Sequence, residues 1–485
     1  MEFKHAKTKI ILDWFEKINQ VPRCSKNEAA ICKWLMDWAK EHNFEAKKDE
    51  VENVLIRIPA SPGYEQSPIC VIQGHMDMVC EKVKGSTHDF DKDPIKFVFT
   101  DDGWLKADGT TLGADNGIAI AMALALALDK EVQHPALELL FTVDEETGLT
   151  GANALQPGFI EGKLLLNVDS EDEGVFTAGC AGGKDTHLEM PAPAEGAPEG
   201  HQAFKVIVGG LRGGHSGVDI AEQRANAMQV LSRVIEELSR LGDMRLATFA
   251  GGTAHNAIPR DAEALVWLDK ATADKAQSKM AELDKAYKNE YAVIDPKVSL
   301  SLEKADSADR TQALNLEVTR KVMDFIQAIP HGVFAMSADI AGLVETSNNL
   351  AEIALGDGKV TALTSQRSSN MDRLDWLTTR VESVGRLCGG TARSGGGYPS
   401  WKPNMDSKLL GRCKEVYTKL FNKEPVVEVI HAGLECGIIG AKYEGMDMIS
   451  FGPTIKNPHS PEECIEVETI GQIWDFMAEL FKSYK

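Results

Sequence analysis

Short, mainly apolar runs alternate with helical segments over the first part of this 485-residue chain. The clearest runs are residues 68–73, 136–143 and 163–168. Strands that are apolar on both faces are typical of mostly parallel sheets covered by helices on both sides. The longest apolar run, residues 118–128, is too short to span a bilayer and predicts a buried helix. The sequence therefore predicts an α/β fold with a mixed, mostly parallel sheet and helices on both faces.

The character of the sequence changes near residue 185 and changes back near residue 395. Residues 191–200 are rich in Pro, Ala, Gly and Glu, which is typical of a surface loop. The following segments run strand, helix, strand, strand, helix, which predicts a separate α+β domain on an antiparallel sheet. The Ser-Gly-Gly-Gly stretch at 394–397 is predicted to be the return hinge. We therefore expect one α/β domain, residues 1–184 and 395–485, interrupted by an α+β domain, residues 185–394, which could contain two similar halves.

Charge and cysteine usage limit the environment and the partners of the chain. The formal net charge of −21 repels phosphate backbones, so we expect no nucleic-acid partner. The nine cysteines are odd in number, widely spaced and without a Cys-x-x-Cys pair, which favours reduced thiols. Residues 1–7 lack the apolar core of a signal peptide. Together these features predict a cytoplasmic protein that does not bind membranes.

Five short segments carry acidic residues or histidine where an apolar strand would end. They are Gly74-His75-Met76-Asp77, Leu112-Gly113-Ala114-Asp115-Asn116-Gly117, Asp144-Glu145-Glu146-Thr147-Gly148, Asn167-Val168-Asp169-Ser170 and Asn457-Pro458-His459-Ser460. In parallel sheets the ligand crevice lies at the carboxyl ends of the strands, so these side chains are expected to meet there. Two histidines with five or six carboxylates match the ligand set of a two-metal hydrolase.

Each segment alone also has a plainer explanation. His75 and Asp77 could be a satisfied polar pair, although a carboxylate beside an imidazole also fixes the tautomer of a metal ligand. Asp115 could be a helix cap, although a helix N-terminus also keeps a ligand carboxylate ionised. The acids at 144–146 could form a solvated turn, or could give one carboxylate to a metal and one to proton transfer. His459 is a candidate metal ligand only because the other four segments leave a two-metal site one imidazole short.

Longer motifs around these segments resemble those of the carnosinase-like di-zinc metallopeptidases. The similarity extends over nearly the whole chain. The motifs are Leu-Gly-Ala-Asp-Asn-Gly at 112–117, Glu-Glu-Thr-Gly at 145–148, Gly-Gly-His-Ser-Gly at 213–217, His-Asn-Ala-Ile-Pro-Arg at 255–260, His-Ala-Gly-Leu-Glu-Cys-Gly at 431–437, Gly-Pro-Thr at 452–454 and Pro-His-Ser-Pro at 458–461.

The resemblance implies two Zn²⁺ ions per chain, with Co²⁺ or Mn²⁺ as alternatives because the ligand preferences of these metals overlap. His75 and Asp169 would bind one ion, and Glu146 and His459 would bind the other. Asp115 would bridge both ions.

The resemblance also assigns the remaining catalytic residues. Asp77 would orient His75 or tune the metal pair, and Glu145 would be the general base. His215 would be a histidine of the inserted lid domain that reaches the scissile carbonyl oxygen. A lid of this kind closes over the substrate and excludes water.

Four further residues are implied to contact the substrate. Asn256 and Arg367 would hold it from the lid domain, Arg367 by pairing with a free C-terminal carboxylate. Gly433 and Glu435 match a loop on the substrate side.

The activity implied by the resemblance is metal-dependent hydrolysis of dipeptides of the Xaa-His type and related ones. The partner would be a small dipeptide, and a homodimer is compatible with the family. An amidohydrolase acting on N-acyl amino acids would need the same metal core. A binding protein that has lost catalysis would lack a ligand or the base, and the sequence retains all of them.

Overall fold

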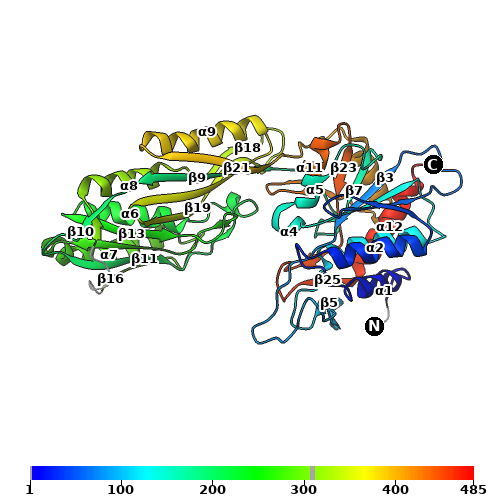
Figure 1. Cartoon of the computed structure of the whole chain (residues 1–485), viewed down its shortest axis with the longest axis horizontal. Helices are drawn as coiled ribbons and strands as arrows, with labels where there is room; N and C mark the ends of the chain where they lie inside the picture. The colour runs from blue at the N-terminus through cyan, green and yellow to red at the C-terminus, as the bar shows by residue number, and fades with distance from the viewer. Residues whose placement is uncertain (1–2, 306–311) are drawn as a thin grey trace. The chain divides into compact units, whose positions relative to one another are not determined.

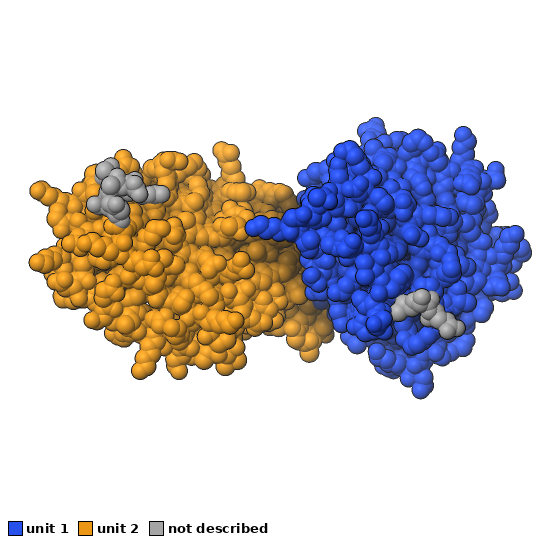
Figure 2. Space-filling model, turned by 90° about the horizontal axis from the view of Figure 1, so that it is seen from below, with its two compact units in different colours: residues 1–180, 401–429, 434–485 blue, residues 181–400, 430–433 orange. Residues whose placement is uncertain are grey.

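The computed structural model describes residues 3–305 and 312–485. The chain divides into two compact units (Figure 2). Unit 1 comprises Met1–Cys180, Trp401–Val429 and Leu434–Lys485, and unit 2 comprises Ala181–Ser400 and Ile430–Gly433.

Unit 1 is built on an eight-stranded mixed sheet in the order β1-β2-β6-β3-β7-β23-β8-β22. Figure 1 labels its strands β3, β7 and β23. The strands are β1 (Glu45–Lys48), β2 (Val54–Ile58), β3 (Cys70–His75), β6 (Leu137–Thr142), β7 (Leu164–Asn167), β8 (Val175–Cys180), β22 (Val426–Ile430) and β23 (Asp447–Ser450). The four central strands β6, β3, β7 and β23 are parallel to one another, and the strands outside them, β2 and β8, pair antiparallel with β6 and β23. Every residue of β3 and β6 is buried, as their continuous apolar sequence predicts.

A second, four-stranded sheet in unit 1 has the order β24-β25-β5-β4. Its strands are β4 (Phe97–Phe99), β5 (Trp104–Ala107), β24 (Ile455–Lys456) and β25 (Cys464–Glu466). This sheet matters for function because β24 and β25 flank the loop that carries His459.

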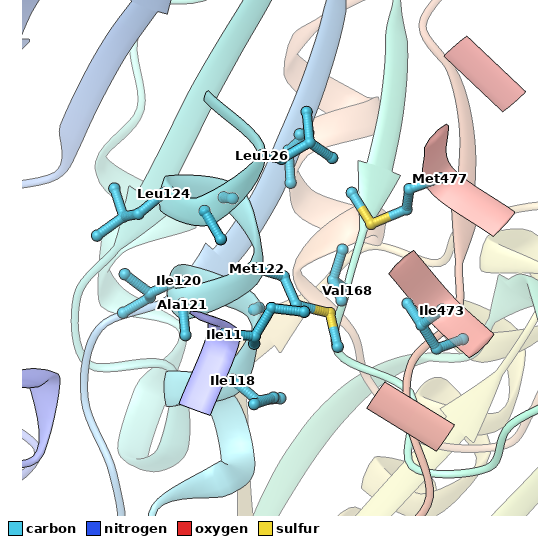
Figure 3. Packing of buried hydrophobic residues seen from close by; sticks show 14 of the residues in the cluster. Ile11, Ile118, Ile120, Ala121, Met122, Leu124, Leu126, Val168, Ile473 and Met477 are labelled. Carbon is cyan, nitrogen blue, oxygen red and sulfur yellow. The ribbon is translucent and has the colours of Figure 1, made fainter. Parts of the chain in front are cut away.

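Helices cover the large sheet of unit 1. They are α1 (Thr8–Ile18), α2 (Ala29–Glu41), α3 (Ala114–Leu128), α4 (Glu145–Gly148), α5 (Thr150–Ala154), α10 (Lys408–Phe421), α11 (Glu435–Lys442) and α12 (Val467–Lys482). Nearly all of α3 is buried, which confirms the predicted buried helix. Figure 3 shows Ile118 and Met122 of α3 in one cluster with Ile11 of α1 and Ile473 of α12. Burial of each such side chain stabilises the fold by roughly 1.5–3 kcal/mol, so the start of α3 is firmly anchored.

Unit 2 is an α+β unit on an antiparallel sheet in the order β16-β11-β15-β13-β19-β20-β9-β21, with β18 also paired to β19. The strands are β9 (Gly182–Pro191), β11 (Gln202–Gly209), β13 (Met244–Gly251), β15 (Ala262–Leu268), β16 (Ser299–Lys304), β18 (Gly332–Met336), β19 (Val344–Gly356), β20 (Lys359–Ser368) and β21 (Thr391–Tyr398). Two short ladders pair β10 (Ala194–Gly196) with β17 (Gln312–Leu314) and β12 (Gly214–His215) with β14 (Ala257–Ile258).

The helices of unit 2 are α6 (Ala227–Ser239), α7 (Lys270–Glu290), α8 (Leu316–Ala328) and α9 (Met371–Leu387), with a 3₁₀ turn at Ile220–Glu222. One apolar cluster joins these helices to the sheet, including Val230 of α6, Val322 of α8 and Val381 of α9. The mixed α/β fold with an inserted antiparallel α+β unit is therefore the fold that the sequence predicts.

The predicted hinge at 394–397 needs correction. Residues 391–398 form strand β21, in which Ser394 pairs with Thr186 and Gly395 with Asp185 of β9. The glycines lie at a break in the register between Gly395 and Tyr398, where a β-bulge tolerates residues without side chains. The chain enters unit 1 at Trp401, and the segment Ile430–Gly433 belongs to unit 2.

The prediction that all thiols are reduced is wrong for one pair. Cys24 and Cys80 form a disulfide with their Cα atoms 5.7 Å apart, across 56 residues of sequence. Their segments are adjacent because Cys24 forms a parallel bridge with Met78. The other seven cysteines are free. Within the described residues, we find no helix with the length and apolar character needed to cross a bilayer.

Candidate metal centre

The strand order of unit 1 gathers the predicted ligands at one edge of the sheet. Strand β3 lies between β6 and β7 and is parallel to both, so the carboxyl ends of all three strands lie together. His75 ends β3, Glu145 and Glu146 follow β6, and Asp169 follows β7. Asp115 lies in the first turn of α3. The topology thus brings residues that are far apart in sequence to a common site.

Asp115 lies between the two histidines. Its Oδ1 is 3.0 Å from Nε2 of His75, and its Oδ2 is 3.1 Å from Nε2 of His459. Each imidazole nitrogen also faces a second carboxylate: His75 lies 3.4 Å from Oδ1 of Asp169, and His459 lies 3.1 Å from Oε2 of Glu146. The result is two groups of close ligand atoms that share Asp115.

The donor set fits metal ions. The ligand atoms of His75, Asp115 and Asp169 lie within 4.8 Å of one another, as do those of Asp115, Glu146 and His459. Oε1 of Glu146 is buried and accepts no hydrogen bond within the described chain, and the buried Oδ1 of Asp169 has the long 3.4 Å contact with His75. Buried carboxylate oxygens of this kind need a cation or a donor. A mixed imidazole and carboxylate set suits zinc and similar divalent ions.

The electrostatics of the site also favour a cation. Hydrogen bonds to Asp115 and Glu146 raise the pKa of His459 to about 11. Burial raises the pKa of Glu146, and the carboxylate of Asp115 raises it further. In the metal-free chain the site therefore attracts protons, and a metal ion competes with those protons for the same ligand atoms.

Asp77 is fully buried and connects His75 to the acid pair Glu145 and Glu146. Its carboxylate faces Nδ1 of His75 at 3.2 Å and accepts hydrogen bonds from the backbone N–H of Glu145 at 3.0 Å and of Glu146 at 3.3 Å. Ser25 Oγ donates to it at 2.8 Å. Although burial opposes ionisation, the His75 contact holds the pKa of Asp77 below its usual range. Asp77 thus fixes the ring of His75 and the start of the following acid pair.

Glu145 has the properties of a group that exchanges protons. Loss of hydration raises the pKa of its carboxyl well above the usual range, against the opposing charge of His75. The carboxylates of Asp169 and Glu146 raise it further. General acid–base catalysis by a carboxyl group uses a pKa raised in this direction.

Glu435 lies in a different setting from the substrate-facing loop position that the resemblance implies. Its side chain is 0% exposed. Its carboxylate accepts hydrogen bonds from Gln73 Nε2 at 2.6 Å and from Thr142 Oγ1 at 2.7 Å, and burial raises its pKa to about 7. Since Gln73 and Thr142 belong to β3 and β6, Oε2 of Glu435 connects the carboxyl ends of these two strands.

The remaining predicted residues cluster in unit 2. Arg367 on β20 is buried and donates to the hydroxyl of Tyr398 at 2.6 Å and to Ser216 Oγ at 3.3 Å. The backbone N–H of Ser216 donates to the carbonyl of Asn256 at 2.8 Å. Gly433 packs against Tyr398, because a Cβ at this position would lie 2.6 Å from the Tyr398 ring.

His215, in the short strand β12, is oriented by its own loop. Its ring Nδ1 accepts hydrogen bonds from the backbone N–H groups of Gly217 at 3.3 Å and Val218 at 3.0 Å. The backbone N–H of His215 donates to Oδ2 of Asp219 at 2.7 Å. An Nδ1 that accepts hydrogen bonds places the proton of the neutral ring on Nε2, which then serves as a hydrogen-bond donor.

Sequence patterns missed two buried residues that support the centre. Arg23 is 2% exposed and donates to the carbonyls of Asp77 at 3.1 Å and Gly113 at 2.6 Å. Glu463 is 2% exposed, and its carboxyl group accepts hydrogen bonds from the backbone N–H groups of Ala114 and Asp115. Neither residue lies in a strand-end motif, and Glu463 looks like one of two ordinary surface acids.

Comparisons with known proteins agree with this architecture. The sequence model of peptidase family M20/M25/M40 matches residues 71–483. The cytosol non-specific dipeptidase of Escherichia coli is 39% identical over 470 residues, which cover 97% of this chain and 96% of that protein.

Solved structures show the same likeness. The aminoacylhistidine dipeptidase of Vibrio alginolyticus is 37% identical with a TM-score of 0.87, covering 99% of this chain and 97% of that one. A tripeptidase of Staphylococcus aureus, 15% identical with a TM-score of 0.56 over 98% of both chains, shares the fold. The chain belongs to peptidase family M20/M25/M40 and is a hydrolase.

Proposed function

We propose that the chain is a dipeptidase that works with two divalent metal ions, zinc in the first instance, at the site centred on Asp115. The observation that carries this proposal is the position of Asp115, whose two carboxylate oxygens each face a different histidine. His75 and Asp169 would hold one ion, and Glu146 and His459 the other. Two ions held by these residues would polarise a scissile carbonyl and acidify the attacking water.

Glu145 would take the proton of the attacking water and deliver it to the leaving amine. Its raised pKa supports this role, since the group must both accept and release a proton. Asp77 would hold His75 in one tautomer through Nδ1.

The residues of unit 2 would recognise the substrate. His215 would donate through Nε2 to the carbonyl oxygen, where negative charge develops. Arg367, with Tyr398 beside it, would bind the C-terminal carboxylate, because a guanidinium matches a carboxylate with two parallel hydrogen bonds. Asn256 and Gly433 would shape the same subsite. Glu435 would support the strand ends through Oε2, which accepts hydrogen bonds from Gln73 of β3 and Thr142 of β6.

Dipeptides, including those of the Xaa-His type, are the proposed substrates. This choice rests on the names of two relatives that match nearly the whole chain, a non-specific dipeptidase and an aminoacylhistidine dipeptidase. The Escherichia coli relative is a cytosol dipeptidase, which supports a cytoplasmic location, whereas the Cys24–Cys80 disulfide is more typical of an oxidising compartment.

Steady-state kinetics with matched substrates test the proposal. We expect the zinc-loaded protein to hydrolyse β-alanyl-histidine and glycyl-histidine at least 100-fold faster, in kcat/KM, than N-acetyl-histidine. Glu145→Gln should lower kcat at least 100-fold, within the range of general acid–base effects, while Glu161→Gln, at an exposed acid of the same unit, should leave it unchanged. A preference for the N-acetyl substrate would favour the amidohydrolase instead. Undiminished turnover by Glu145→Gln would refute the proposed base.

A further inference from the structure

The turn that presents Asp115 is held by a residue from the far end of the chain. Residues 112–115 form the turn at the start of α3, whose N-cap Gly113 has a left-handed backbone with φ 67° and provides no side-chain cap. Asp115 itself has extended dihedral angles, φ −80° and ψ 103°. The backbone N–H groups of this turn therefore need partners from elsewhere in the fold.

Glu463 supplies those partners. Its Oε2 accepts the N–H groups of Leu112 at 2.7 Å and Gly113 at 2.9 Å. Its Oε1 accepts those of Ala114 at 2.7 Å and Asp115 at 3.2 Å. Four consecutive N–H groups converge on the two oxygens of this one carboxyl group, an arrangement that forms an anion-binding concavity.

The carbonyl side of the same turn is held by donors. Arg23 Nη2 donates to the Gly113 carbonyl at 2.6 Å, and Asn19 Nδ2 donates to the Leu112 carbonyl at 3.0 Å. Asn19 Oδ1 in turn accepts from Arg23 at 3.0 Å. A Cβ on Gly113 would lie 2.3 Å from Arg23 Nη2, so the turn has little room to shift.

Glu463 also lies four residues after His459, and the Nε2 atom of His459 faces Oδ2 of Asp115. The Glu463 N–H donates to the Ser460 carbonyl at 3.0 Å, which closes a tight turn between the two residues. One short segment therefore carries a proposed metal ligand and also fixes the backbone of the proposed bridging ligand.

We propose that Glu463 is a positioning residue, which sets the affinity of the centre for its second metal ion by fixing the turn that presents Asp115. This inference rests on the proposed function. Metal sites need their ligands within about 0.5 Å of the productive geometry. Without the hydrogen bonds to Glu463, Asp115 can move relative to His459. We therefore expect the affinity for the ion that these two residues share to fall most.

Metal titration of the metal-free protein tests this inference. The variants are Glu463→Gln, which retains one acceptor oxygen of similar shape, and Glu463→Asp, which retains the charge on a shorter side chain. The matched control is Glu462→Gln, whose exposed side chain makes only a 3.6 Å ion pair with Lys106. Zn²⁺ is added in competition with a chelating dye, and circular dichroism checks the fold of each protein.

We expect the wild type and Glu462→Gln to bind two Zn²⁺ ions. Glu463→Gln should bind the first ion within threefold of the wild type and the second at least tenfold more weakly. Glu463→Asp should fall between them. At saturating zinc, KM for a dipeptide should be unchanged in all folded variants.

Two outcomes separate the inference from the proposed function. If Glu463→Gln binds both ions as tightly as Glu462→Gln does, and loses only thermal stability, Glu463 is structural and the inference is overturned. If the wild type binds no zinc, the proposed function itself fails. Should Glu463→Gln not fold, Glu463→Asp decides, and wild-type affinity for the second ion in that variant overturns the inference.

Discussion

The Nε2 atom of His459 lies 3.1 Å from Oδ2 of Asp115, a residue 344 positions earlier in the chain. The other oxygen of Asp115 lies 3.0 Å from His75. Asp115 is thus the point where three distant segments of the chain meet, and the proposed two-metal chemistry depends on it. Each of the two imidazoles also faces a second carboxylate, His75 that of Asp169 and His459 that of Glu146.

Replacement of Asp115 tests its bridging role. We expect Asp115→Asn to bind at most one Zn²⁺ per chain and to lose at least 100-fold in kcat/KM, since a neutral amide is a poor bridge between two cations. Elemental analysis of the dialysed protein measures the zinc content. Asp108→Asn, at an exposed position before the same turn, serves as the control. Two ions in Asp115→Asn would contradict the assignment.

Asp77 is predicted to act through His75 and through the backbone of the acid pair. Asp77→Asn keeps one acceptor and the shape of the side chain but loses the charge. Residues that support metal ligands typically contribute 10–100-fold to metal affinity or activity. We expect a loss of that size in kcat, with KM within threefold of the wild type. Full activity together with unchanged metal affinity would show that Asp77 only satisfies buried hydrogen bonds.

The Cys24–Cys80 disulfide predicts a measurable effect on stability. The bond closes a loop across 56 residues beside Asp77, and a disulfide of this loop size typically stabilises a fold by roughly 2–4 kcal/mol. We expect Cys24→Ser/Cys80→Ser to lower the free energy of unfolding by this amount, while Cys388→Ser leaves it unchanged. Thiol titration of the denatured, unreduced protein should find seven thiols. Nine thiols would mean that the pair is reduced.

His431 predicts a pH dependence of stability. Burial lowers the pKa of this imidazole to about 3, and the charges of Arg367 and His215 contribute. Its ordinary pKa is 6.5, so below pH 6.5 the unfolded chain binds a proton that the folded chain rejects. The stability from neutral His431 is complete above pH 6.5 and falls by about 1.4 kcal/mol per pH unit below it.

Urea unfolding between pH 7.5 and 5 measures how the free energy of unfolding changes with pH. Replacement of the buried ring by His431→Gln should flatten the slope, whereas His187→Gln, at an exposed position on β9, should not. Equal slopes in the wild type and His431→Gln would contradict the account.

The sequence could predict whatever follows from local pattern. Continuous apolar runs predicted β3, β6 and β7 as buried parallel strands, and their shared direction explains why His75, Glu146 and Asp169 meet. The change of pattern near residue 185 predicted the inserted antiparallel unit.

Long-range contacts could not be predicted in this way. Glu463 binds amides about 350 residues away, and nothing in Pro-Glu-Glu-Cys at 461–464 indicates a buried anion. Arg23 and the Cys24–Cys80 bond depend on where the segment before α2 packs, which local sequence does not encode. The glycines at 395–397 suggested a hinge, although a β-bulge uses the same backbone freedom.

Anomalous diffraction at the zinc absorption edge, from crystals of the zinc-loaded protein, tests the central claim most directly. The account predicts two peaks roughly 3.5–4 Å apart, with one oxygen of Asp115 on each. One peak should lie beside His75 and Asp169, and the other beside His459 and Glu146. A single peak, or two peaks that do not share Asp115, would contradict it.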